Sequence, residues 1–135
     1  MITENCIFCK IVRNQSLAYP IYEDEDVLAF MDNRPVSEGH TLVITKKHYE
    51  NIYAVPDEEV EHLFRIVKKV TLAVKTAVKA EGVRIVQSNG SSAGQVIFHI
   101  HVHVIPAYEG QNIHFRKTYE AKELERIAAK IRPYI

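Results

Sequence analysis

The chain has 135 residues, of which 47% are hydrophobic and 25% charged, and this composition predicts one folded domain of ordinary size. The 17 basic and 17 acidic side chains balance, so nothing indicates nucleic acid or a membrane surface as an electrostatic partner. No apolar run approaches the ~20 residues that span a bilayer, and residues 1–5 lack a signal-peptide pattern, so we expect the cytoplasm.

The N-terminal third of the chain predicts a short helix followed by three strands. Residues 6–12 form an apolar stretch that suits one or two helical turns. Residues 18–22, 27–31 and 41–45 are short apolar runs separated by turn-like segments. Their spacing predicts an antiparallel meander.

A long helix is the clearest predicted element. We expect it to begin at Pro56, where three acidic residues follow and favour the positive end of a helix dipole. Hydrophobic residues then recur at helical spacing from Val60 to Val78, and Gly82 is expected to end the helix.

Two further strands and a final helix are predicted in the rest of the chain. The strands are residues 83–87 and 96–105, joined by a polar, glycine-containing loop, and Pro106 is expected to end the second. Residues 120–131 carry an apolar helical face. Together these elements predict an α+β fold, a mostly antiparallel sheet with the long helix and the C-terminal helix packed on one face.

Three histidines alternate with apolar residues in the second of these strands. Successive strand residues point to opposite faces, so His99, His101 and His103 share one face. The other face, expected to face the core, carries Phe98, Ile100, Val102 and Val104. Three aligned imidazoles have no folding benefit. They indicate either a zinc site or nucleophilic and acid–base chemistry at phosphorus.

The loop before this strand favours chemistry at phosphorus. Asn89, Gly94 and Gln95 lie on a turn of small residues, and such turns expose backbone N–H groups that bind phosphate oxygens. Metal sites of this kind usually include carboxylates, and none lies between Glu81 and Glu109. The other histidines outside conspicuous motifs, His62 and His114, are expected at the surface.

Several separate motifs resemble the histidine triad (HIT) family of nucleotide hydrolases and transferases. Residues 89–106 (NGSSAGQVIFHIHVHVIP) are similar to its His-x-His-x-His signature and the preceding Gly-Gln loop. Residues 32–48 (DNRPVSEGHTLVITKKH) resemble its ribose-binding turn, and residues 4–12 (ENCIFCKIV) resemble the N-terminus of the Hint-like bacterial branch. The resemblance implies a HIT domain over residues 1–107, with 108–135 as a helical extension of the same domain.

The resemblance also implies a hydrolase that cleaves nucleoside 5′-phosphoramidates or related phosphoanhydrides through a nucleotidyl-histidine intermediate. His101 would attack the α-phosphorus, His103 would contact the phosphate and assist proton transfer, and His40 would support the histidine cluster. Asp32 would bind the ribose hydroxyls. The implied phosphate contacts are Asn89, Gly94, Gln95 and the backbone N–H of Val96.

The expected partners are a purine nucleotide and a second copy of the chain in a homodimer. The residues that would hold the base are Ile7, Phe8, Ile11 and Phe30, for which ordinary core packing is an equal explanation. Two residues depart from the family pattern: Val96 replaces a frequent Ser or Thr, and Ala107 replaces a frequent arginine.

Cys6 and Cys9 form a Cys-x-x-Cys motif, which zinc binding, redox chemistry or coincidence would each explain. The βαβ context of a thioredoxin-like redox pair is missing. Zinc would need two further ligands, and the resemblance to the Hint-like branch implies His48 and His99. The alternative is two reduced, buried cysteines and a His99 that forms only hydrogen bonds.

Two other functions stay open at this point. A dinucleoside polyphosphate hydrolase of the Fhit-like branch would suit residues 93–95 and the Arg34-Pro35 pair, although Asp32 and the cysteine pair count against it. A nucleotide-binding or scaffold protein with vestigial catalysis is the alternative from a different class. The intact His101 and His103 argue against that alternative.

Overall fold

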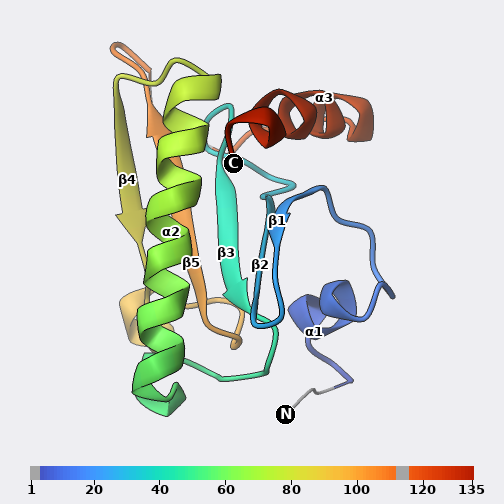
Figure 1. Ribbon diagram of the computed structural model, residues 1–135, viewed down its shortest axis with the longest axis vertical. Helices are drawn as coiled ribbons and strands as arrows, with labels where there is room; N and C mark the ends of the chain where they lie inside the picture. Colours follow the sequence, from blue (N-terminus) through green and yellow to red (C-terminus); the bar gives the residue numbers. More distant parts are fainter. Residues whose placement is uncertain (1–3, 112–115) are drawn as a thin grey trace.

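One antiparallel sheet of five strands, in the order β1-β2-β3-β5-β4, organises the computed structural model, which describes residues 4–111 and 116–135. In chain order the elements are α1 (Ile7–Val12), β1 (Pro20–Glu23), β2 (Val27–Met31), β3 (Thr41–Thr45), the 3₁₀ turn η1 (Ile52–Ala54), α2 (Asp57–Ala77), β4 (Gly82–Val86), the turn η2 (Ser91–Ala93), β5 (His101–Ala107), α3 (Ala121–Ile131) and η3 (Arg132–Tyr134). The predicted meander is present as β1 to β3, and β5 lies between β3 and the edge strand β4 (Figure 1).

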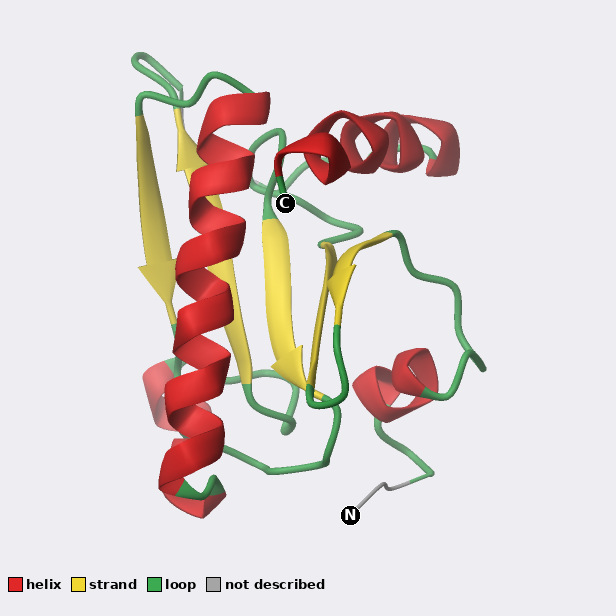
Figure 2. Cartoon of the chain, in the orientation of Figure 1, coloured by secondary structure: helices red, strands yellow, loops and turns green. Residues whose placement is uncertain are grey.

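Every residue of the central strands β2 and β3 is buried. Neighbouring strand residues point to opposite sides, so both faces of the sheet are covered at these two strands. Ala29 and Val43 point into the larger core, which the helices α2 and α3 cover. Phe30 and Leu42 point to the other face, where they pack with Phe8 of α1. The predicted arrangement, a mostly antiparallel sheet with the long helix and the C-terminal helix on one face, is therefore confirmed (Figures 1 and 2).

Helix α2 begins directly after Pro56, as predicted, but it ends before Gly82. Its last helical residue is Ala77. Lys79 adopts a left-handed conformation with φ of 55°, and the Ala80 N–H donates to the Lys75 carbonyl at 3.0 Å. This local turn ends the helix. Gly82 is the first residue of β4.

Helix α3 packs its apolar face into the same core as α2. The buried residues of that face are Leu124, Ile127, Ala128 and Ile131. The C-terminal segment thus shares one core with the sheet, and the predicted division at residue 107 stays a prediction.

Strand β5 begins at His101 and not at residue 96 as predicted. The Ile100 N–H donates to the Tyr49 carbonyl at 2.7 Å, which ties the chain to the loop after β3 just before the strand starts. Phe98 was expected in the core, but it lies on the bend before the strand with 41% of its surface exposed.

Pro106 does not end β5, which continues to Ala107. The Pro106 carbonyl accepts a hydrogen bond from Ser37 Oγ at 2.6 Å, on the side where β3 has not yet begun. The N–H that proline lacks would face the same side, so its absence breaks no bond between strands.

No helix in residues 4–111 and 116–135 is both long and apolar enough to cross a membrane. His62, expected to be solvated, hydrogen-bonds Asp24 Oδ2 through Nε2 at 2.7 Å, with 28% of its side chain exposed. His114 lies outside the described residues.

Candidate active site

A cavity of about 420 Å³ opens beside α1, the end of β2 and the first half of β5. Its polar walls include the imidazoles of His101 and His103 and the carboxylate of Asp32. Its apolar walls include the four residues predicted to hold a base: Ile7, Phe8, Ile11 and Phe30. Apolar walls with a few convergent polar groups are typical of a site for a small organic ligand.

His101 presents a lone pair at Nε2, which accepts no hydrogen bond from residues 4–111 and 116–135. Its Nδ1 lies 2.7 Å from the His99 carbonyl oxygen. A carbonyl only accepts hydrogen bonds, so Nδ1 carries the proton and Nε2 does not. The ring packs edge-on against Phe8, with centroids 5.1 Å apart. Burial lowers the pKa of His101, which keeps the imidazole neutral and nucleophilic near pH 7.

His103 has the opposite tautomer, which a chain of hydrogen bonds sets. The Val36 N–H donates to His40 Nδ1 at 3.1 Å, so neutral His40 carries its proton on Nε2. That Nε2 lies 2.9 Å from His103 Nδ1, which therefore accepts. The proton of His103 is then on Nε2, so the two imidazoles of the cavity differ: His101 has a lone pair at Nε2 and His103 has an N–H.

Burial keeps this chain of imidazoles neutral. His40 is fully buried, and burial lowers its pKa to about 4 against the pull of Asp32 in the other direction. Burial also lowers the pKa of His103 to about 4, with a smaller contribution from the neighbouring His40 and His101. His40 does not line the cavity. It acts on the site through His103.

Asp32 lies directly after β2 with only 6% of its surface exposed. Its Oδ1 accepts from the Arg34 N–H at 2.8 Å, and its Oδ2 lies 3.1 Å from Arg116 Nη1. His40 Nε2 is 3.4 Å from the same Oδ2. The carboxylate predicted to bind ribose is therefore in the cavity wall, and both of its oxygens have partners.

The predicted phosphate contacts divide into two groups. Gly94 and Val96 line the cavity, and 83% of the Val96 surface is exposed. Asn89 and Gln95 instead brace the loop. Asn89 Oδ1 accepts from the Ile52 N–H at 2.9 Å, and Gln95 Nε2 donates to the Glu50 carbonyl at 2.6 Å. The structure does not bring these two amides into the cavity wall, and their phosphate role stays a prediction.

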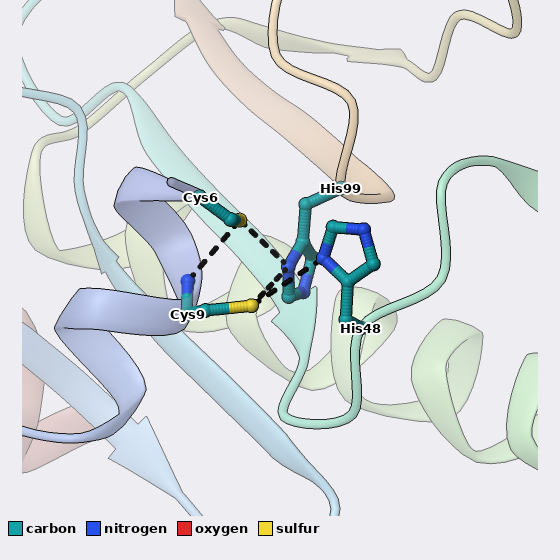
Figure 3. A group of neighbouring side chains, drawn as sticks. All are labelled: Cys6, Cys9, His48 and His99. Atoms are coloured by element: carbon teal, nitrogen blue, oxygen red, sulfur yellow. Dashed lines mark hydrogen bonds between the residues drawn. The ribbon is translucent and has the colours of Figure 1, made fainter. Parts of the chain in front are cut away.

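Cys6, Cys9, His48 and His99 form a compact cluster at the start of β5 (Figure 3). Their four nearest sulfur and nitrogen atoms all lie within 4.8 Å of one another, and both cysteines are free. His99 Nε2 is 2.7 Å from the Thr45 carbonyl oxygen and donates to it, which leaves the Nδ1 lone pair facing the two sulfurs. His48 Nδ1 lies 3.3 Å from Cys9 Sγ. Two thiols and two imidazoles are a donor set typical of a tetrahedral metal site.

Several cavity residues were missed from the sequence: Leu17, Ala18, Tyr19, Met31, Asn33, Arg34, Leu42, Ile97 and Arg116. Leu42 had a signal, because strand alternation puts it on the histidine face, opposite His103 in the neighbouring strand. Arg116 had none. It follows β5 in a segment without periodicity or motif and reaches the site only through the tertiary fold.

Comparison with known proteins identifies the family. The HIT domain family model matches residues 13–110. The chain is 46% identical over 105 residues to Protein hit of Bacillus subtilis, covering 78% of this chain and 72% of that protein. It is 37% identical over 108 residues to the adenylylsulfatase HINT3 of Arabidopsis thaliana, covering 80% of this chain and 55% of HINT3.

Solved structures agree. A hypothetical histidine triad nucleotide-binding protein from Sulfolobus tokodaii superposes with a TM-score of 0.90 at 44% identity, over 96% of this chain and 91% of that one. A Zn-bound histidine triad family protein from Mycobacterium smegmatis superposes with a TM-score of 0.87 at 34% identity, over 96% and 92%. The chain belongs to the HIT family and has Hint-like bacterial relatives.

The buried, neutral His40 makes stability depend on pH. Its pKa is about 4 in the folded protein against an ordinary 6.5, so below pH 6.5 the unfolded chain binds a proton that the folded chain refuses. Stability is therefore lost as the pH falls from 6.5 towards 4. Between pH 7.5 and pH 5, His40 contributes a loss of about 2 kcal/mol in the free energy of unfolding. Urea titrations at both pH values should show that His40→Gln reduces the difference by about this amount. An unchanged difference would contradict the assignment.

Proposed function

We propose that the chain is a nucleotide hydrolase that cleaves nucleoside 5′-phosphoramidates or related phosphoanhydrides, with a purine nucleotide as substrate. The observation that carries the proposal is the pair of opposite tautomers in one cavity. His101 presents a lone pair at Nε2 and His103 an N–H, and hydrogen bonds of 2.7 Å and 2.9 Å hold the two rings in these forms. A nucleophile beside a hydrogen-bond donor is what displacement at phosphorus requires.

The reaction has two displacements. His101 Nε2 attacks the α-phosphorus, the Nε2–P bond forms, and the bond to the leaving nitrogen breaks. The leaving nitrogen keeps the bonding electron pair and takes a proton from water in the cavity. Water then attacks the phosphorus, the Nε2–P bond breaks, and the proton of that water replaces the one consumed. His103 donates its Nε2–H to a phosphoryl oxygen as negative charge develops there.

The other cavity residues would hold the nucleotide. Asp32 accepts hydrogen bonds from the ribose hydroxyls, and the apolar side chains of α1 and Phe30 hold the base. The backbone of Gly94 and Val96 contacts the phosphate. The volume of about 420 Å³ is near the small end of ligand pockets, which favours a mononucleotide with a small leaving group over a dinucleoside polyphosphate.

Removal of the nucleophile should stop turnover but not binding. His101→Ala is expected to lower kcat for an adenosine phosphoramidate by roughly 10³-fold or more, while AMP still binds in calorimetry. The matched control is His62→Ala, because His62 lies on α2 and does not line the cavity. A His101→Ala variant with wild-type kcat would contradict the assignment of His101 as the nucleophile.

The same assay distinguishes the competing functions. Parallel turnover of a diadenosine polyphosphate separates the Fhit-like alternative from the proposed phosphoramidase. A vestigial enzyme that only binds nucleotides would show no burst of product and no trapped nucleotidyl-His101.

We also propose that Cys6, Cys9, His48 and His99 hold a structural zinc ion. The donor set fits zinc because two sulfurs and two Nδ1 atoms converge and the Thr45 carbonyl fixes the tautomer of His99. With four protein ligands the ion would supply cross-linking and no catalytic chemistry. Reduced cysteines as ligands are consistent with the proposed cytoplasmic location.

Zinc should be present in protein purified without added metal, at about one equivalent per chain. His48→Ala is expected to lose most of the zinc and to lower Tm by several degrees, because a structural metal contributes to folding free energy. His62→Ala replaces a histidine outside the cluster and should keep both. Less than about a tenth of an equivalent in the wild type, measured by elemental analysis, would count decisively against the site.

The edge strand β4 supports a homodimer. The Pro106 carbonyl points away from β4 and accepts from Ser37 Oγ. Its β4 partner Val83 and, two residues on, Ile85 therefore turn their backbone groups away from β5. Ile85 is also 43% exposed. An edge with unpaired backbone groups pairs readily with another strand, and we propose a second copy of β4 as the partner.

Light scattering tests the dimer. Ile85→Pro removes one outward N–H without breaking the β4–β5 ladder, so it is expected to give a folded monomer. Ile85→Val keeps the N–H and should remain dimeric. A wild-type chain that is monomeric at micromolar concentration would rule the dimer out.

A further inference from the structure

Arg116 reaches the active-site cavity from a segment far along the chain. Its Nη1 lies 3.1 Å from Asp32 Oδ2 and 2.6 Å from the Arg34 carbonyl oxygen. The next residue, Lys117, donates its backbone N–H to the Pro35 carbonyl at 2.6 Å. Residues 116 and 117 are therefore fastened to the turn that follows β2, and the guanidinium lies in the cavity wall.

This guanidinium bonds the carboxylate oxygen that a ribose would also use. The Arg34 N–H already uses Asp32 Oδ1, and Arg116 uses Oδ2. A carboxylate oxygen can accept more than one hydrogen bond, but only 8% of the Asp32 side chain is exposed. A ribose diol that donates to Oδ2 therefore competes with Arg116 for the accessible side of that oxygen, and we expect it to displace the guanidinium. The displacement is feasible because 42% of the Arg116 side chain is exposed, whereas only 8% of the Asp32 side chain is. The arginine can swing while the carboxylate stays in place.

Charge indicates what Arg116 does once it is displaced. The charged side chains among the described lining residues are Asp32, Arg34 and Arg116, and the imidazoles are neutral. A phosphate entering beside a lone buried carboxylate would be repelled, and a neighbouring cation offsets that repulsion. The guanidinium fork matches phosphate oxygens in geometry as well as charge. Arg116 shares the cavity with Gly94, His101 and His103, where the phosphate is expected.

We propose, on the basis of the proposed function, that Arg116 is a specificity-determining residue that selects nucleotides over nucleosides. In the free protein it covers Asp32. When a nucleotide binds, it yields Asp32 to the ribose hydroxyls and pairs with an anionic phosphate oxygen. A nucleoside has no phosphate, so its binding would break the contact between Arg116 and Asp32 without giving Arg116 a new anionic partner.

Calorimetric Kd values for adenosine and AMP test this exchange. Arg116→Ala is expected to weaken AMP binding by about tenfold or more, the loss of one charge-assisted hydrogen bond. Adenosine should bind the variant as well as the wild type or better, because nothing competes for Asp32. Arg116→Lys keeps the charge without the fork and should fall between. Lys117→Ala, the same change of charge one residue away on an exposed side chain, should leave both Kd values unchanged.

The ratio of the two Kd values decides the outcome. A purely structural role for Arg116 would weaken both ligands by the same factor and leave the ratio as in the wild type, and this result overturns the proposal. Thermal melting of each variant verifies that the fold is intact. A wild-type protein that binds neither adenosine nor AMP overturns the proposed function together with this inference, whereas wild-type binding with an unchanged ratio overturns the inference alone.

Discussion

The two-residue period of β5 is the constraint on which the rest of this molecule depends. Ile100, Val102 and Val104 are fully buried in the core under α2 and α3. The residues between them, His101 and His103, must therefore face the opposite side, where the cavity is. A slip of one residue would exchange the core side chains with those that line the cavity. The packing of the core thus determines the face on which the imidazoles lie.

Once the rings are positioned, backbone groups decide their protonation. The His99 carbonyl fixes one tautomer, and the Val36 N–H fixes the other through His40. Both effects use peptide groups, whose donor and acceptor characters cannot change. The low polarity of the surroundings then keeps the imidazoles neutral. Chemistry near pH 7 is in this way a property of the fold around the site as much as of the histidines.

Periodicity and local chemistry predicted much of this structure from the sequence. The strands at Val27–Met31 and Thr41–Thr45 and the long helix have the predicted type and place, because each has a repeating apolar pattern. The same alternation placed His101 and His103 on one face. The proposed zinc ligand set came from the resemblance, since spacing alone linked only Cys6 with Cys9.

Features that depend on distant contacts were not predictable. The late start of β5 results from a bond between Ile100 and Tyr49, which lie in different parts of the chain. Helix α2 ends at Ala77 with a left-handed Lys79 after it, although Gly82 was expected to end the helix. Gln95 Nε2 donates to the Glu50 carbonyl, a contact across 45 residues that the loop sequence does not indicate. Arg116 reaches Asp32 across 84 residues, and no local pattern reports such an encounter.

Helix α1 belongs to two sites at once. Cys6 and Cys9 lie in the cysteine–histidine cluster, while Ile7 and Phe8, between them in the chain, line the proposed nucleotide cavity. Six residues are too few to form a stable helix in isolation, so an occupant of either site helps to order the same backbone. Linkage then requires reciprocity: whatever free energy one ligand gains from a preformed α1, the other gains equally. The two sites would communicate through shared order in the helix, without direct contact between their ligands.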